Sequence, residues 1–179
     1  KKANFFNGNK TNDFFKIKAN NNIKKFIFFS TSHVYRNPLR GNINENTKPS
    51  NKHPYALSNL LGEKLILNSS KKIATQLVIL RLSNIYGYPI NMQSNCWHLI
   101  VQSLCLQSIK RKKLVLNTNG LQRRDFSPMK SLCIFIKKLL NKNKKFDTKI
   151  INFGNGKSQN ILDVAKLIQI GTRKKFNYV

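Results

Sequence analysis

Short apolar runs that alternate with longer segments of helical period constrain the fold of this chain most strongly. The predicted strands are FIFF (26–29), LVIL (77–80), LVL (114–116) and IINF (150–153). Apolar residues repeat every three or four positions in the segments between and around them, which predicts helices over 9–20, 55–69, 94–109, 128–141 and 160–170. Strands that alternate with helices favour an α/β fold with a largely parallel sheet whose strands are buried on both faces.

The charge of the chain is extreme, at a formal +27 from 33 lysines and arginines against six acids. A nucleic-acid partner or an anionic surface would explain such a charge. A drift in composition toward lysine and asparagine explains it as well. The lysines are scattered and are not interleaved with aromatic residues as in a base-stacking platform, which argues against nucleic acid. No apolar run reaches the roughly 18 residues of a membrane span.

The cysteines and the start of the chain indicate the cellular setting. Cys96, Cys105 and Cys133 show no CxxC spacing and, together with the three histidines, no metal signature. They are predicted to be small buried apolar residues in a reducing, cytoplasmic protein. The first residues have no apolar stretch typical of a signal peptide. Because the sequence begins with Lys1 rather than methionine, we expect a fragment or a processed product.

Several motifs follow the predicted strands and helices in order: STSHVY (30–35), YALSNLLGE (55–63), LRLSNIYG (80–87), GLQRRDF (120–126) and INFGNGKSQNILDVAKLI (151–168). Together they resemble the extended short-chain dehydrogenase/reductase family, the NAD-dependent epimerases and dehydratases that act mostly on nucleotide sugars. The family patterns are S-[ST]-x-x-V-Y-G, Y-x-x-S-K-x-x-x-E, L-R-x-x-N-V-Y-G, G-x-x-x-R-D-F and N-x-G-x-G-x-x-x-S-V-x-E-L-A. Residues 7–20 also resemble the family's preceding helix.

The resemblance implies a Rossmann-like parallel sheet with flanking helices, incomplete at its N-terminus, and a small C-terminal substrate-binding segment. Residues 1–86 would be the second half of an NAD(P)-binding domain. Residues 87–179 would mostly bind substrate, with 150–153 returning to the sheet. The phosphate-binding loop G-x-G-x-x-G, which follows the first strand of such a fold, is absent from the sequence. The cofactor would be NAD or NADP, and its main binding loop would lie outside this chain.

The resemblance also implies roles for individual residues. Tyr55 would be the catalytic acid/base and would contact the cofactor, while Thr31 would hydrogen-bond the same sugar oxygen. Asn59 would contact the cofactor ribose. Asn84 and Arg124 would contact the nucleotide sugar, Arg124 at its phosphate, which suits the planar donor fork of a guanidinium. Among the rare acids, Glu63 is predicted to pack or pair locally. Asp125 is predicted to order a turn or to pair with a neighbouring arginine.

Three positions depart from the family pattern. Asn59 stands where the family has a lysine whose charge favours the tyrosinate, and asparagine supplies no charge. One branch of the family, with the pattern S-T-x-H-V-Y-G-x-P-L-x-G-x-I-x-E and then H-P-Y-A-I-S-H, carries histidine there and occurs in polysaccharide-related sugar metabolism. Arg36 replaces the glycine after V-Y, and Ser131 replaces an acid after R-D-F.

Three hypotheses remain open from the sequence. The first is an enzyme that carries out redox chemistry on a nucleotide sugar, in polysaccharide biosynthesis if the branch resemblance extends that far. The second is a catalytically silent relative that binds a nucleotide sugar or a partner protein. The third is a basic protein that binds nucleic acid or an anionic surface. A homodimer is left open.

Overall fold

The computed structural model describes residues 5–20, 23–141 and 148–176. The chain forms two compact units. The first unit contains Lys1–Ser83 and Phe135–Phe153, and the second contains Asn84–Ile134 and Gly154–Val179. None of the helices in these described ranges is long and apolar enough to cross a membrane. The assignment of 1–86 to cofactor and of 87–179 to substrate stays a prediction.

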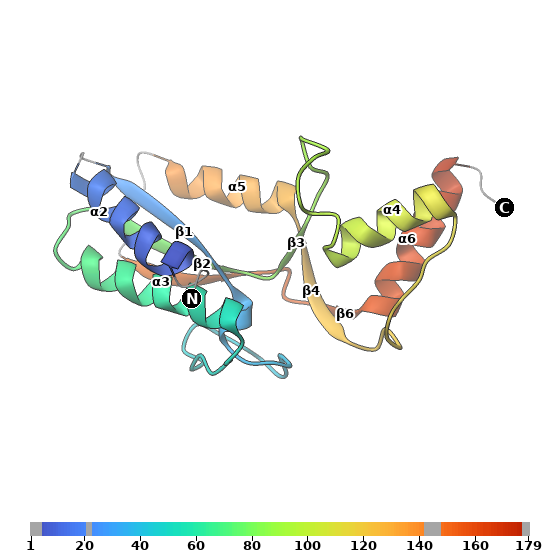
Figure 1. The fold of residues 1–179 in the computed structure, drawn as a ribbon, viewed down its shortest axis with the longest axis horizontal. Helices are drawn as coiled ribbons and strands as arrows, with labels where there is room; N and C mark the ends of the chain where they lie inside the picture. The colour runs from blue at the N-terminus through green and yellow to red at the C-terminus, as the bar shows by residue number, and fades with distance from the viewer. Residues whose placement is uncertain (1–4, 21–22, 142–147, 177–179) are drawn as a thin grey trace. The chain divides into compact units, whose positions relative to one another are not determined.

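The first unit is built on a three-stranded parallel sheet (Figure 1). Its strands are β1 (Lys25–Thr31), β2 (Gln76–Leu82) and β5 (Lys149–Phe153), in the order β1-β2-β5. The central strand β2 is buried along its interior, from Leu77 to Arg81, because neighbouring elements cover both of its faces. The predicted strands at 26–29, 77–80 and 150–153 and the α/β, Rossmann-like fold class are therefore confirmed.

Helical elements of the first unit flank this sheet. They are the π-helical segment η1 (Phe5–Lys10), α2 (Thr11–Asn20), the 3-10 turn η2 (Ser32–Val34) and α3 (Pro54–Ser70). α2 packs beside α3, and α3 packs on β1 and β2 (Figure 1). Their contact forms the hydrophobic core, whose buried members are Phe15, Phe28, Ile66, Leu77 and Ile79.

A glycine allows η1 to approach α3 closely. A Cβ atom at position 62 would collide with the backbone oxygen of Asn7 and would also press on the ring of Phe28. Only Gly62 avoids this overlap, because it has no side chain. The helix predicted over 9–20 is an α-helix only from Thr11, and the residues before it belong to the π-helical segment η1.

In the residues that the structure describes, the second unit contains three short strands, two whole helices and the first part of a third. β3 (Asn84–Tyr86) pairs in parallel with β4 (Arg123–Pro128), and β4 pairs antiparallel with β6 (Ser158–Asn160). The helices α4 (Ile100–Arg111) and α6 (Ile161–Phe176) pack on each other, and the hydroxyls of Ser108 and Thr172 lie 2.5 Å apart between them. The division between the units falls inside α5 (Met129–Leu140).

Three predictions from the sequence are wrong. Residues 114–116 are not a strand, because this run pairs with no other strand and Val115 is 49% exposed. The helix predicted over 94–109 begins only at Ile100, after a series of turns. Cys133 is exposed on α5, although it was expected to be buried; Cys96 and Cys105 are half-buried.

Candidate functional site

Thr31 lies at the carboxyl end of β1. In open parallel α/β sheets, ligands bind outside the carboxyl ends of the strands. Thr31 is 5% exposed, and its hydroxyl oxygen accepts a hydrogen bond from the backbone N–H of His33 at 3.2 Å. This bond makes Thr31 the N-cap of η2. Because the oxygen acts here as an acceptor, the hydroxyl hydrogen can still be donated to another oxygen.

Tyr55 is the second residue of α3. The helix begins at Pro54, whose fixed φ and missing N–H suit the first helical position. His53 is the N-cap, and its ring nitrogen Nδ1 accepts from the backbone N–H of Tyr55 at 3.3 Å. The Tyr55 side chain is 50% exposed, so the phenol is accessible from solvent.

A series of hydrogen bonds joins the turn after Thr31 to the start of the Tyr55 helix. The side-chain amide of Asn51 donates to the backbone oxygen of His33 at 2.7 Å, and its oxygen accepts from the N–H of His53 at 2.9 Å. The backbone N–H of Asn51 also donates to Val34, at 3.3 Å. Thr31 and Tyr55 are thereby held by one bonded segment, although 23 residues lie between them in the sequence.

Asn59 faces into the first unit, one helical turn after Tyr55. It is 6% exposed, and its side-chain nitrogen donates to the backbone oxygen of Tyr55 at 2.9 Å. Ser58, which is fully buried, donates to the same oxygen at 2.9 Å. The amide nitrogen of Asn59 is therefore engaged by its own helix, and the predicted contact of Asn59 with a cofactor ribose stays untested.

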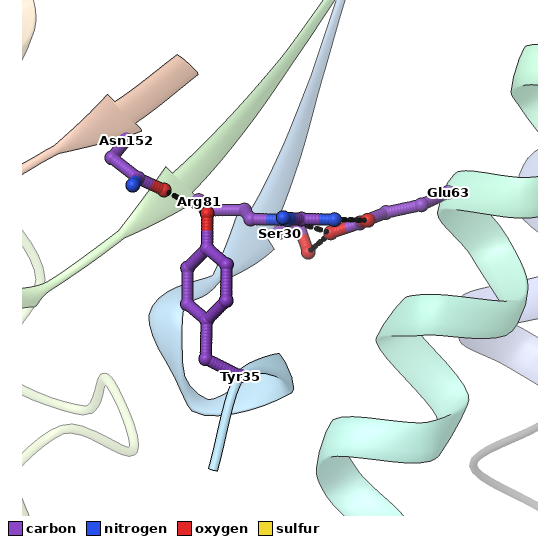
Figure 2. A network of polar contacts seen from close by, with 5 residues as sticks. All are labelled: Ser30, Tyr35, Glu63, Arg81 and Asn152. Carbon is purple, nitrogen blue, oxygen red and sulfur yellow. Dashed lines mark hydrogen bonds and ion pairs between the residues drawn. The ribbon is translucent and has the colours of Figure 1, made fainter. Parts of the chain in front are cut away.

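A buried polar network includes Glu63 and Ser30, the residue before Thr31 (Figure 2). Arg81 of β2 donates to both carboxylate oxygens of Glu63, at 3.0 Å from Nε and 2.6 Å from Nη2. The hydroxyl of Ser30, next to Thr31, donates to the same carboxylate. The predicted local pairing of Glu63 is confirmed. The network fixes α3 to the ends of β1 and β2.

The network continues from Arg81 to β5. The guanidinium of Arg81 lies 4.8 Å from the centre of the buried Tyr35 ring, and the Tyr35 hydroxyl donates to Asn152 at 2.7 Å (Figure 2). Burial by itself lowers the pKa of Arg81, but its bonds with Glu63 and its contact with Tyr35 outweigh burial and raise that pKa. Arg81 is therefore a permanent cation inside the first unit.

The long loop between Tyr35 and His53 is anchored to the sheet. The carboxylate of Glu45 accepts from the backbone N–H of Asn152 on β5 at 2.7 Å. Closer to its end, the Ser50 hydroxyl donates to the backbone oxygen of Tyr35 at 2.7 Å. Arg36, at the position of the family glycine, is exposed, and its guanidinium donates to the backbone oxygen of Arg40. The arginine is accommodated because its side chain runs along this loop.

The second unit holds Asn84 and Arg124. The side-chain amide of Asn84 on β3 donates to the backbone oxygen of Asp125 at 2.9 Å, so Asn84 lies beside the residue that follows Arg124 on β4. The carboxylate of Asp125 accepts from the backbone N–H groups of Asn155 and Gly156, each at 2.8 Å. The prediction that Asp125 orders a turn is confirmed. The contacts of Asn84 and Arg124 with substrate stay predictions.

Within the first unit, Asn59 bonds the backbone of Tyr55, and Thr31 is connected to Tyr55 through His33, Asn51 and His53; Asn84 and Arg124 lie in the second unit. Sequence analysis did not identify Asn51 or the capping role of His53. The one sequence signal of Asn51 is its position just before Pro54, whereas His53 also begins the H-P-Y-A-I-S-H pattern. Among the described residues, no group of three or more His, Cys, Asp or Glu side chains could hold a metal ion.

Comparison with known proteins identifies the family of the chain. The sequence model of the NAD dependent epimerase/dehydratase family matches residues 7–154. The chain is 31% identical over 147 residues to the uncharacterized UDP-glucose epimerase YtcB of Bacillus subtilis (strain 168), covering 82% of this chain and 44% of that protein. It is 30% identical over 152 residues to the dTDP-D-glucose 4,6-dehydratase of Bos taurus, covering 83% and 40%.

A solved structure gives the same result. The UDP-glucuronic acid 4-epimerase from Bacillus cereus, in complex with UDP-glucuronic acid and NAD, matches with a TM-score of 0.81 and 25% identity, over 97% of this chain and 52% of that one. The chain therefore spans about half the length of the relatives it matches. Since the family model covers most of the sequence, the chain belongs to the NAD dependent epimerase/dehydratase family.

Proposed function

We propose that the protein containing this chain is an NAD-dependent epimerase or dehydratase that carries out redox chemistry at a carbon of a nucleotide sugar. The observation that carries the proposal is the joined pair of Thr31 and Tyr55. Thr31 ends a parallel strand where such sheets bind ligands, and the exposed Tyr55 begins the next helix. The relatives named above are nucleotide-sugar enzymes, which supports the same substrate class.

The two side chains have complementary tasks in this proposal. Tyr55 exchanges a proton with a sugar hydroxyl, and Thr31 donates its hydroxyl hydrogen to the same oxygen and orients it. Tyr55 and Asn59 would contact NAD, and the chemistry that NAD would supply is the acceptance and return of a hydride. The substrate contacts of Arg124 and Asn84 stay predictions from the family resemblance, and Asn84 bonds the backbone oxygen of Asp125.

The second candidate function is that of a catalytically silent relative. One observation supports it, namely the uncharged and hydrogen-bonded side chain of Asn59. It brings no charge toward Tyr55, and its amide nitrogen already bonds the Tyr55 backbone oxygen. Tyr55 therefore has no cation one helical turn along to favour its anion, as a lysine at this position would. A protein of this kind could bind a nucleotide sugar without turning it over.

The experiment that separates the two uses the full-length protein, its Asn59→Lys variant and its Tyr55→Phe variant. Each is incubated with NAD and UDP-, GDP- and dTDP-sugars, and NADH absorbance and sugar products are followed. The enzyme proposal expects turnover by the unmodified protein with at least one sugar and its loss in Tyr55→Phe. Turnover only after Asn59→Lys, together with binding of a nucleotide sugar by the unmodified protein in calorimetry, would instead establish the silent relative.

A further inference from the structure

We propose that Asn51 is a positioning residue that sets Tyr55 relative to Thr31. This inference rests on the proposed function for its catalytic consequence, but its structural part can be measured without turnover. Asn51 lies in the loop just before α3, outside every motif that identifies the family. It is half-buried, whereas most of the loop around it is exposed.

The carboxamide of Asn51 uses both of its polar atoms to bridge two segments. Its nitrogen donates to the backbone oxygen of His33, the residue whose own N–H is held by the Thr31 hydroxyl. Its oxygen accepts from the N–H of His53, whose ring caps the N–H of Tyr55. The amide nitrogen therefore bonds a residue that also bonds Thr31, and the amide oxygen bonds a residue that also bonds Tyr55.

Two other contacts tie the chain before α3 to the turn after β1, from the backbone N–H of Asn51 to Val34 and from Ser50 to Tyr35, and the side-chain bonds of α3 to other elements begin only in its second turn. Glu63 fixes the helix two turns after Tyr55, and Ser58 bonds Asn7 of η1 at 3.1 Å. The Tyr55 end itself follows a loop of 19 residues, 35–53. Because Asn51 donates to His33 before the loop and accepts from His53 at its end, its side chain fixes the distance between these two residues. A misplacement of a catalytic group by about 1 Å can cost about 100-fold in rate.

The test compares variants that remove one or both of these bonds. Asn51→Ala removes both, whereas Asn51→Asp keeps an acceptor for His53 and removes the donor to His33. Asn44→Ala is the matched control. Asn44 is an asparagine of the same loop, and its oxygen accepts from Asn46 and Thr47 but from neither end of the loop.

Two readouts are measured on the full-length protein. The first is amide hydrogen exchange at Tyr55, which we expect to accelerate roughly threefold to tenfold in Asn51→Ala, as for one lost hydrogen bond, and to stay unchanged in Asn51→Asp and Asn44→Ala. The second is steady-state kinetics. We expect kcat to fall about 10- to 100-fold in both Asn51 variants while KM for the sugar nucleotide stays within about twofold, with no change in Asn44→Ala.

Each outcome decides one point. Unchanged exchange at Tyr55 in Asn51→Ala overturns the bridge, whatever the rates are. Accelerated exchange with an unchanged kcat keeps the bridge and refutes its catalytic role. A protein that exchanges as expected but shows no turnover in any form refutes the proposed function and leaves the bridge standing.

Discussion

The pair of Arg81 and Glu63 allows a sharp test of the buried network. The two side chains are 4% and 1% exposed, and two hydrogen bonds join them. The substitution Glu63→Gln removes the negative charge but keeps the shape of the side chain. Arg81 is then a buried cation without a counter-ion, and loss of one partner of such a pair costs about 3–5 kcal/mol. Since a domain of this size has a total stability of about 5–15 kcal/mol, the loss would be large.

A double substitution separates the cost of an orphaned charge from the value of the pair. In Glu63→Leu/Arg81→Met both charges are gone, and replacement of a buried pair by apolar side chains is often neutral. Ser30, which is 5% exposed, would lose the acceptor of its hydroxyl, and this adds about 1–3 kcal/mol. The double variant is therefore expected to be more stable than Glu63→Gln. Lys64→Gln, on the exposed side of the same helix, is the control and should change stability by less than about 0.5 kcal/mol.

Urea unfolding followed by far-ultraviolet circular dichroism measures these differences. The pKa of Arg81 is raised in the folded protein, so its contribution is fully present below the unfolded value and is lost only as the pH rises through the folded value. The effect of Glu63→Gln should therefore be the same at neutral and at mildly alkaline pH, as far as Arg81 is concerned. A loss below about 1 kcal/mol in Glu63→Gln would refute the reasoning, as would a double variant that is no more stable than Glu63→Gln.

Two other predictions concern packing and reactivity. Gly62→Ala should lower the free energy of unfolding by about 1–3 kcal/mol because its methyl group meets the Asn7 backbone oxygen. Gly171→Ala in α6, where a Cβ meets nothing within 4 Å, should raise the free energy of unfolding by about 0.5–1 kcal/mol. Thermal melts of both variants measure the difference, and equal effects of the two substitutions would contradict the role of local packing. Burial raises the pKa of Cys105, whereas Cys133 is exposed on α5. Iodoacetamide at mildly alkaline pH should therefore alkylate Cys133 before Cys105, as followed by peptide mass spectrometry, and the reverse order would contradict this burial.

The sheet of the first unit was predictable because its strands carry their own signal. The runs at 26–29 and 77–80 are wholly apolar, and the run at 150–153 is interrupted only by Asn152, as is typical of strands in a parallel sheet. The strand β4 has no such signal, since it reads RRDFSP and forms only because β3 and β6 pair with it. Conversely, the run at 114–116 has the composition of a strand but no partner, and the N–H of Val115 bonds the side chain of Gln107 instead.

The late start of α4 also depends on contacts that the sequence does not display. The residues before Ile100 form turns, in which the indole N–H of Trp97 donates to the backbone oxygen of Met92 at 2.9 Å. The backbone N–H of Leu99 donates to the backbone oxygen of Cys96 at 3.0 Å. Helical periodicity cannot distinguish such a segment from the first turns of a helix.

Parts of the candidate site were predictable for a similar reason. Thr31 ends an apolar run and Tyr55 follows a helix-start proline, so each has a local signal. The Asn51 bridge joins residues 18 positions apart, and it exists only because the loop returns to the turn after β1. The hydrogen bond of the Asn59 amide to the Tyr55 backbone was not predicted from the sequence, although an asparagine inside a helix commonly bonds the local backbone.

The five acids in the described part of the chain each occupy a place that needs negative charge or an acceptor. Glu45, Glu63 and Asp125 accept the hydrogen bonds described above, while Asp13 and Asp163 lie in the first turns of α2 and α6, where the helix dipole favours an anion. Neutralising any of them would raise the net charge of +27 further and would also remove one of these contacts. A less basic form for purification and crystallisation would replace exposed lysines by glutamine or glutamate and leave these five carboxylates untouched.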